Sequence, residues 1–594
     1  MRTNLKAIST LCLLLLMVPV YRSQVPQTTS PIFVDDDNTT GTEQGTEQFP
    51  FNTIQEAIDA AVATGDTIRI AAGTYVENIR VQDKTVHLLG GYAGGSRSDY
   101  GNGSGGDFSS RLPTTNPSHI QGDGSDAAVT LINPGAGTLD GFRITGGTGS
   151  SEGLPWASLG GGIYIEGGTP TISNNLIEDN DSRRADVSSI DDTMGGGIYA
   201  MEADVTLLIN IIRNNTSGRG AGVALFGGSV IARRNTIERN VGMSDHGGGL
   251  EIGTSTAEIS HNLIRENEIG RNLGYGWGGG ISFFNPGNKA TLSYNIVTGN
   301  YAPTAGAGVF IDDGAEAVLE HELIYNNQCP ENGGAGVYVD GGDGHRSKAT
   351  LIHTTIANHA CSDTQGGLLL DVLSDATVTN SIFWRNGGDD FEVAQGSTLT
   401  VTYTDSEEAM AGTGNLSSEP FFADPGTGDF HLRSSGGRWD TSAGGGNGGW
   451  IFDVEDSPAI DAGDPSSSYA NEPAPNGAQA NMGAYGNTAQ ASRSQLATAV
   501  VADADVLQDI MLYPNYPNPF SQVTVIRFTL SVPQPVRLTV YDVQGREVAV
   551  LVDGPRAAGT HEIPFEALGL RGGVYFYQIE TGTVTQTQTM LLLR

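Results

Sequence analysis

Three aspartates stand at equal distances from a repeated glycine-rich motif. Asp312, Asp340 and Asp371 each lie four residues after the last glycine of one motif copy. If successive copies stack as neighbouring coils, the carboxylates line one face about 4.8 Å apart and repel one another. A hard cation with oxygen ligands, such as Ca²⁺, would relieve that repulsion. The spacing therefore predicts a metal site here, and solvated turn aspartates are the alternative.

Aromatic side chains recur at a second fixed offset, one residue after the first apolar residue of the motif. Alternate residues of a strand face opposite ways, so we expect these rings to point outward. Rings stack on the apolar faces of sugars, and nearby carboxylates accept bonds from hydroxyl groups. The pattern predicts carbohydrate binding, unless long loops cover the rings and form a secondary core. One register further lie Phe226 and Phe284, with Trp277 in the preceding loop. The rings at the first offset are Tyr164, Tyr199, Phe310 and Tyr338.

The two cysteines outside the N-terminal segment fit the same repeat. Cys329 lies five residues after Ile324, and Cys361 lies five residues after Ile356. Stacked Cα atoms about 4.8 Å apart fall inside the range of about 4.4–6.8 Å that a disulfide requires. The spacing predicts a bridge between Cys329 and Cys361.

The repeat that would position these residues has a period of 25–35 residues. Each unit holds alternating apolar residues broken by Gly and Asn, and none shows the 3.6-residue spacing of a helix. Propeller blades are longer, at about 40–50 residues. The content predicts an all-β, right-handed parallel β-helix, with Asn side chains stacking at the turns. The motif copies are GGGIYI at 160–165, GGGIYA at 195–200, GAGVAL at 220–225, GGGLEI at 247–252, GGGISF at 278–283, GAGVFI at 306–311, GAGVYV at 334–339 and GGLLL at 366–370.

A solenoid needs a cover at its end, and residues 53–62 have the spacing of a helix with Ile54, Ile58 and Ala61 on one face. We expect this helix to cap the N-terminal end of a solenoid over residues 32–405. Residues 406–487 are expected to form irregular C-terminal coils or a second cap.

Several segments resemble secreted bacterial β-helix proteins of the pectate-lyase-like superfamily. They are FNTIQEAIDAAVATGDTIRIAAGTYVENI at 51–79, LLGGYAGG at 88–95, LDGFRITGG at 139–147, SPAIDAGDP at 457–465 and NMGAYGNT at 481–488. The resemblance implies the fold, and it implies a lyase reaction in which a basic residue abstracts the proton beside a Ca²⁺-bound uronic carboxylate. His345, Arg346 and Lys348 are the candidates for that base. A cationic side chain needs a depressed pKa for this role, and the surrounding polar, glycine-rich loop offers no cause for one.

Residues 488–507 are small and polar and read as a linker, and 508–594 show an all-β pattern typical of a small sandwich. This last segment resembles the type A C-terminal sorting domain of the type IX secretion system. The matching pieces are PNPF at 517–520, VYDVQGREV at 540–548, GVYFYQIE at 573–580 and the terminal MLLLR. The resemblance implies the secretion machinery as a partner and a secreted or cell-surface location.

Charge and hydropathy exclude several functions. The net charge is −36, with 31 basic against 67 acidic residues, so binding of nucleic acid is not expected. Residues 1–23 read as a signal peptide, with a membrane anchor as the alternative, and no later stretch is apolar enough for an integral membrane protein.

Three functions remain after these exclusions: a polysaccharide-binding protein or adhesin of the cell surface, a Ca²⁺-dependent polysaccharide lyase, and a structural surface rod.

Overall fold

The computed structural model describes residues 31–495 and 510–593, with gaps at 63, 153, 155, 185, 254–255, 272, 331–332, 343, 362–364, 447, 531 and 582–583. The expected signal peptide and most of the expected linker lie outside the described residues. The chain divides into two compact units, Met1–Leu496 and Ala497–Arg594, and each is considered by itself.

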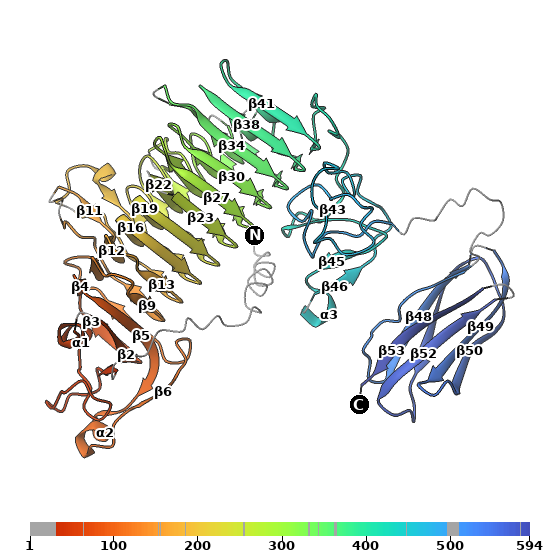
Figure 1. Cartoon of the computed structure of the whole chain (residues 1–594), viewed down its shortest axis with the longest axis horizontal. Helices are drawn as coiled ribbons and strands as arrows, with labels where there is room; N and C mark the ends of the chain where they lie inside the picture. Colours follow the sequence, from red (N-terminus) through yellow and green to blue (C-terminus); the bar gives the residue numbers. More distant parts are fainter. Residues whose placement is uncertain are drawn as a thin grey trace, which may run out of the picture. The chain divides into compact units, whose positions relative to one another are not determined.

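The first unit is a right-handed parallel β-helix, as predicted (Figure 1). The motif strands pair in parallel from coil to coil, beginning with β12 (Ile163–Glu166) against β16 (Ile198–Leu208). A second face is a parallel sheet of twelve described strands in chain order, from β3 (Gly73–Val76) to β42 (Asp405–Ser406). The later motif strands are β19 (Val223–Arg233), β22 (Leu250–Gly253), β26 (Ile281–Phe284), β29 (Val309–Ile311), β33 (Val337–Val339) and β37 (Gln365–Leu370).

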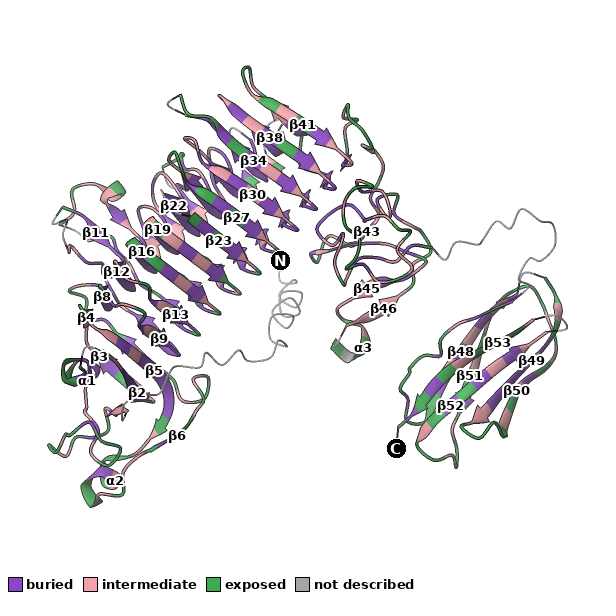
Figure 2. Cartoon of the chain, viewed as in Figure 1, coloured by how far each residue is buried: buried purple, intermediate pink, exposed green. Residues whose placement is uncertain are grey.

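Glycine is required at two positions of the motif for different reasons. The first glycine has a positive φ, 66° at Gly160 and 65° at Gly195, a conformation that other residues adopt only with strain. At the last glycine, neighbouring coils approach closely: a Cβ on Gly222 would lie 2.4 Å from the carbonyl oxygen of Gly249. The alternation that follows places residues such as Ile163 and Ile165 in one continuous core, and Figure 2 shows buried residues along the coils.

Two asparagine ladders run through the turns of consecutive coils, confirming the predicted stacking. Each amide oxygen accepts hydrogen bonds from the backbone N–H and the side-chain Nδ2 of the asparagine on the previous coil. Each Nδ2 also donates to a backbone carbonyl, so the buried polar groups of the turns are paired. One ladder holds Asn175, Asn210, Asn235, Asn262 and Asn295. The other holds Asn180, Asn215, Asn240, Asn267, Asn300 and Asn327.

Asn240→Ala is expected to lower the free energy of unfolding by about 2–3 kcal/mol. The change removes the acceptor of the Asn215 N–H and Nδ2 groups, both 3.0 Å away, and the donor to the Ile212 carbonyl. A buried polar group left unpaired costs about 1–3 kcal/mol. Chemical denaturation measures the loss, with Asn471→Ala, at an exposed turn position, as the control that should stay near wild type. Equal stability of both variants would contradict a stabilising role of the ladder.

The N-terminal cap helix is confirmed as α1 (Ile54–Ala60). Ile54, Ile58 and Ala61 are all buried against the first coils. The carboxylate of Glu77 accepts hydrogen bonds from the N–H groups of Ile54 (2.8 Å) and Gln55 (3.0 Å). These bonds pair two of the backbone donors that a helix N-terminus leaves free.

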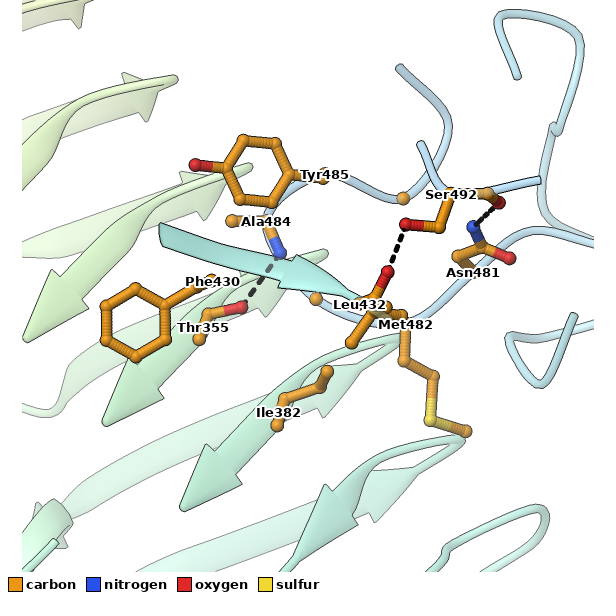
Figure 3. Close-up of a pocket in the computed structure, with 11 residues that line it drawn as sticks. Thr355, Ile382, Phe430, Leu432, Asn481, Met482, Ala484, Tyr485 and Ser492 are labelled. Atoms are coloured by element: carbon orange, nitrogen blue, oxygen red, sulfur yellow. Dashed lines mark hydrogen bonds between the residues drawn. The ribbon is translucent and has the colours of Figure 1, made fainter. Parts of the chain in front are cut away.

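Residues 421–495, the flank module, lie against the side of the last coils. The module contains two short antiparallel hairpins, β43 (Phe422–Asp424) with β44 (Asp429–Leu432) and β45 (Arg438–Asp440) with β46 (Gly449–Ile451). Its Phe430, Leu432 and Met482 share a buried cluster with solenoid residues such as Ile382. Figure 3 shows this contact, in which the N–H of Ala484 donates to Oγ1 of Thr355 at 2.9 Å. The module therefore covers outward side chains of the solenoid.

The second unit is a β-sandwich of two antiparallel sheets. One sheet holds β47 (Ile510–Leu512), β48 (Val523–Leu530) and β51 (Gly559–Glu566). The other holds β50 (Glu547–Arg556), β49 (Gln534–Asp542), β52 (Gly573–Glu580) and β53 (Thr585–Leu592). Their inner faces share one apolar core, which confirms the predicted sandwich.

Candidate binding face of the solenoid

The motif strands present two outward rows of side chains. The buried row consists of Tyr164, Tyr199, Ala224, Glu251, Ser282, Phe310, Tyr338 and Leu369, which are register partners on successive coils. The half-exposed row lies two residues further along each strand and consists of Glu166, Met201, Phe226, Gly253, Phe284, Asp312, Asp340 and Asp371. All of them are half-buried except Gly253, which is buried.

The four aromatic residues expected to contact sugar belong to the buried row. Tyr164, Tyr199, Phe310 and Tyr338 are 0%, 5%, 2% and 8% exposed. Loop residues such as Leu154, Met194 and Trp277 pack over them and form secondary cores. The expectation that these rings line an open surface is therefore wrong, because loops between the coils cover them.

Two other rings remain accessible in the half-exposed row. Phe226 and Phe284 lie on alternate coils with centroids 5.8 Å apart, in an edge-to-face arrangement. Gly253 lies between them, and a Cβ there would be 2.7 Å from Phe284 and 3.0 Å from Phe226. Glycine at this position therefore allows both rings to lie over the intervening strand.

The aspartates follow these rings in the same row. Backbone bonds of 2.8 Å from Asp340 N to Ile311 O and from Asp371 N to Val339 O continue the pairing of β29, β33 and β37. Burial and the neighbouring Asp340 raise the pKa of Asp312 to about 6, and burial with Asp371 raises the pKa of Asp340. The Tyr338 hydroxyl donates to Oδ2 of Asp371 at 2.6 Å.

Equivalent side chains on stacked coils form a line and do not converge on one point. Among the described residues, no group of three or more His, Cys, Asp or Glu side chains is placed to hold a metal ion. The geometry thus lends no support to Ca²⁺ bound at Asp312, Asp340 and Asp371.

The three candidate bases are each paired with a different carboxylate. His345 Nδ1 lies 3.0 Å from Asp313, the Arg346 guanidinium 2.7 Å from Asp375, and Lys348 Nζ 3.3 Å from Glu316. All three are substantially exposed, with side-chain accessibilities of 52%, 39% and 54%. The structure does not bring them together at one reacting centre.

A buried charged cluster beneath this face was not expected from the sequence. Arg219 Nε donates to Oε1 of Glu251 at 2.9 Å, and the Glu251 side chain is 0% exposed. His246 stacks on Phe310 and lies 3.1 Å from Asp245. Burial raises the pKa of Glu251, although Arg219 and His246 oppose that shift. The sequence feature that could have indicated this cluster is Glu251 itself, a charged residue in a row that otherwise holds aromatic, apolar and small residues.

Cys329 and Cys361 are register partners on adjacent coils, as the spacing predicts. The structure nevertheless joins neither of them in a disulfide, so the predicted Cys329–Cys361 bridge is not formed here. The Cys329 thiol is directed at backbone carbonyls, 3.1 Å from Thr304 O and 3.3 Å from Gly333 O. A hydrogen bond with the Cys329 side chain and burial both raise the pKa of Cys361, which disfavours the reactive thiolate.

Comparison with known families agrees with this architecture. The family model for a right-handed β-helix region matches residues 114–315 and 279–414. The model for a secretion system C-terminal sorting domain matches residues 515–592. A search among curated proteins finds no relative. No helix in the described part of the chain has both the length and the apolar character needed to cross a membrane. The chain therefore belongs to the right-handed β-helix family and carries a type IX sorting domain, which directs it to the cell surface or the extracellular medium.

Proposed function

We propose that this exported protein binds a polysaccharide along the half-exposed row and acts as a surface adhesin or carbohydrate-binding protein. The observation that carries the proposal is the continuation of Phe226 and Phe284 into Asp312, Asp340 and Asp371 within one register. Rings and carboxylates thus lie on one line, half accessible to solvent.

This arrangement suits an extended polymer of sugars. Aromatic faces contact the apolar faces of sugar rings, and carboxylates accept hydrogen bonds from hydroxyl groups. The coils from Phe226 to Asp371 span about 24 Å at about 4.8 Å per coil, so a linear ligand can contact several coils at once. Hydroxyl donors would also stabilise the crowded carboxylates of Asp312 and Asp340, whose pKa values are raised.

A glycan array followed by calorimetry on the full chain tests the proposal. Phe226→Ala/Phe284→Ala is expected to weaken binding about tenfold, since each ring loses its sugar contact. Tyr516→Ala is the control, because this ring is 77% exposed but belongs to the C-terminal unit. Affinity should also fall as pH is lowered from 7.5 to 5, because Asp312, with a pKa of about 6, then gains a proton and loses acceptor capacity.

The alternatives are distinct outcomes of the same assay. Release of unsaturated uronides, measured by absorbance with and without chelator, would establish that the protein is a polysaccharide lyase. Absence of binding to every glycan would leave the structural rod and refute the proposal, as would unchanged affinity in the double phenylalanine variant.

A further inference from the structure

The hairpin of β45 and β46 in the flank module carries two tryptophans at paired positions. Trp439 and Trp450 are register partners with ring centroids 5.4 Å apart and planes at 74°. Both indoles are half-buried, and the nearby Phe452 is 48% exposed. Figure 1 shows the hairpin at one end of the module, with α3 (Ala443–Gly446) beside it. Grouped aromatic surface left accessible to water indicates contact with another molecule.

Ion pairs stabilise the base of this hairpin. Arg438, only 7% exposed, lies 3.2 Å from Asp429, 3.1 Å from Asp453 and 3.8 Å from Asp440. The Asp453 carboxylate also accepts a bond from Ser434 N at 2.9 Å. The paired rings are therefore presented in one orientation before any ligand arrives, which reduces the entropy lost on binding.

One cationic side chain lies beside these aromatic rings. The guanidinium carbon of Arg493 lies 3.9 Å from the centroid of the Trp450 ring. Its Nε is buried without a hydrogen-bond partner, and no ion pair joins Arg493 to a carboxylate within the described part of the chain. Most other arginines in the described part of this acidic protein are paired with Asp or Glu, so the Arg493 guanidinium is available to bind an anionic group.

We propose that Trp439, Trp450, Phe452 and Arg493 form a second binding site, for the anionic sugars of an acidic polysaccharide. The aromatic side chains contact the apolar faces of the sugars, and the planar guanidinium pairs with a carboxylate or sulfate group, for which its geometry is suited. The site lies outside the half-exposed row and does not rest on binding there.

Intrinsic tryptophan fluorescence of the full chain, titrated with oligosaccharides, tests this site. The probes are polygalacturonate oligosaccharides, a sulfated galactan oligosaccharide and neutral cello-oligosaccharides. At least one anionic probe should give a saturable change in tryptophan fluorescence, and the neutral probe should bind at least tenfold more weakly. The two anionic probes together show whether a carboxylate or a sulfate group is recognised. Arg493→Gln and Trp439→Ala should each weaken that binding about tenfold. Trp156→Ala, at a 55% exposed tryptophan of a solenoid loop, should leave it unchanged.

Melting curves of each variant separate lost binding from lost folding. If Arg493→Gln proves unstable, Trp439→Ala decides the question, because Arg493 makes its cation–π contact with Trp450 and not with Trp439. The proposal is overturned if no anionic probe binds, if the neutral probe binds equally well, or if both variants bind like wild type. Phe226→Ala/Phe284→Ala should retain this binding, which distinguishes failure of the second site from failure of the solenoid face.

Discussion

Replacing Arg219 by methionine is expected to lower the free energy of unfolding by about 3–5 kcal/mol, the largest loss that we predict for a single side chain. Two guanidinium nitrogens, Nε and Nη2, contact Oε1 of Glu251, whose side chain is fully buried. The arginine also lies over the ring of Phe284 at 5.5 Å. Without it, the buried Glu251 carboxylate loses its guanidinium partner and must stay charged without that partner or take up a proton.

Denaturant unfolding of Arg219→Met measures the effect, and two further variants identify its cause. Arg233→Met is the matched control: its partner Glu258 is 58% exposed, and removal of such a surface pair should cost less than about 1 kcal/mol. Arg219→Met/Glu251→Leu should recover most of the lost stability, since a buried pair replaced by apolar groups is often nearly neutral. If the double variant is as unstable as the single one, the unpaired carboxylate is not the cause.

Glu322→Gln is expected to stabilise the protein by about 3 kcal/mol at pH 7 and by very little at pH 4. Glu322 occupies the place after Asn295 in the first asparagine ladder, and its Oε1 accepts from Asn295 N at 3.0 Å and Nδ2 at 2.9 Å. Its Oε2 is buried without a partner. Burial raises the pKa of Glu322 from 4.5 to about 8, despite the bonds from Asn295.

The sign follows from proton linkage. Below pH 4.5 the carboxyl is protonated in both the folded and the unfolded chain, so it carries no penalty. Between pH 4.5 and about 8 the unfolded chain releases this proton while the folded chain keeps it, so stability falls as pH rises. Glutamine does not titrate and can supply the ladder acceptor from a side chain of the same length.

Thermal melts of wild type and Glu322→Gln at pH 4, 6 and 8 measure this dependence. The difference between the two proteins should widen as pH increases. Glu202→Gln, at an exposed position of β16, serves as the control for loss of one negative charge. A pH-independent difference would show that Glu322 does not titrate in this window.

The coils themselves were predictable because the information that specifies them is local. The glycine spacing, the alternation of apolar residues and the recurring asparagines each constrain one turn, and the same constraints repeat on the next coil. The register of Asp312, Asp340 and Asp371 followed from that repetition, as did the pairing of Cys329 with Cys361. The sorting domain was equally recognisable, because its motifs lie in order within fewer than one hundred residues.

What covers the coils was not predictable in the same way. A residue pattern states that Tyr164 or Phe310 points outward, but loops that pack over the strands decide whether an outward ring meets water. The same holds for the buried pair of Arg219 with Glu251, which joins neighbouring coils across 32 residues, and for Thr355 with Ala484, which are 129 residues apart. The sequence by itself determined the solenoid, its register and its C-terminal sorting domain, because these depend on local spacing. Only the tertiary structure decided which outward side chains are accessible, because burial depends on contacts between segments that carry no shared periodicity.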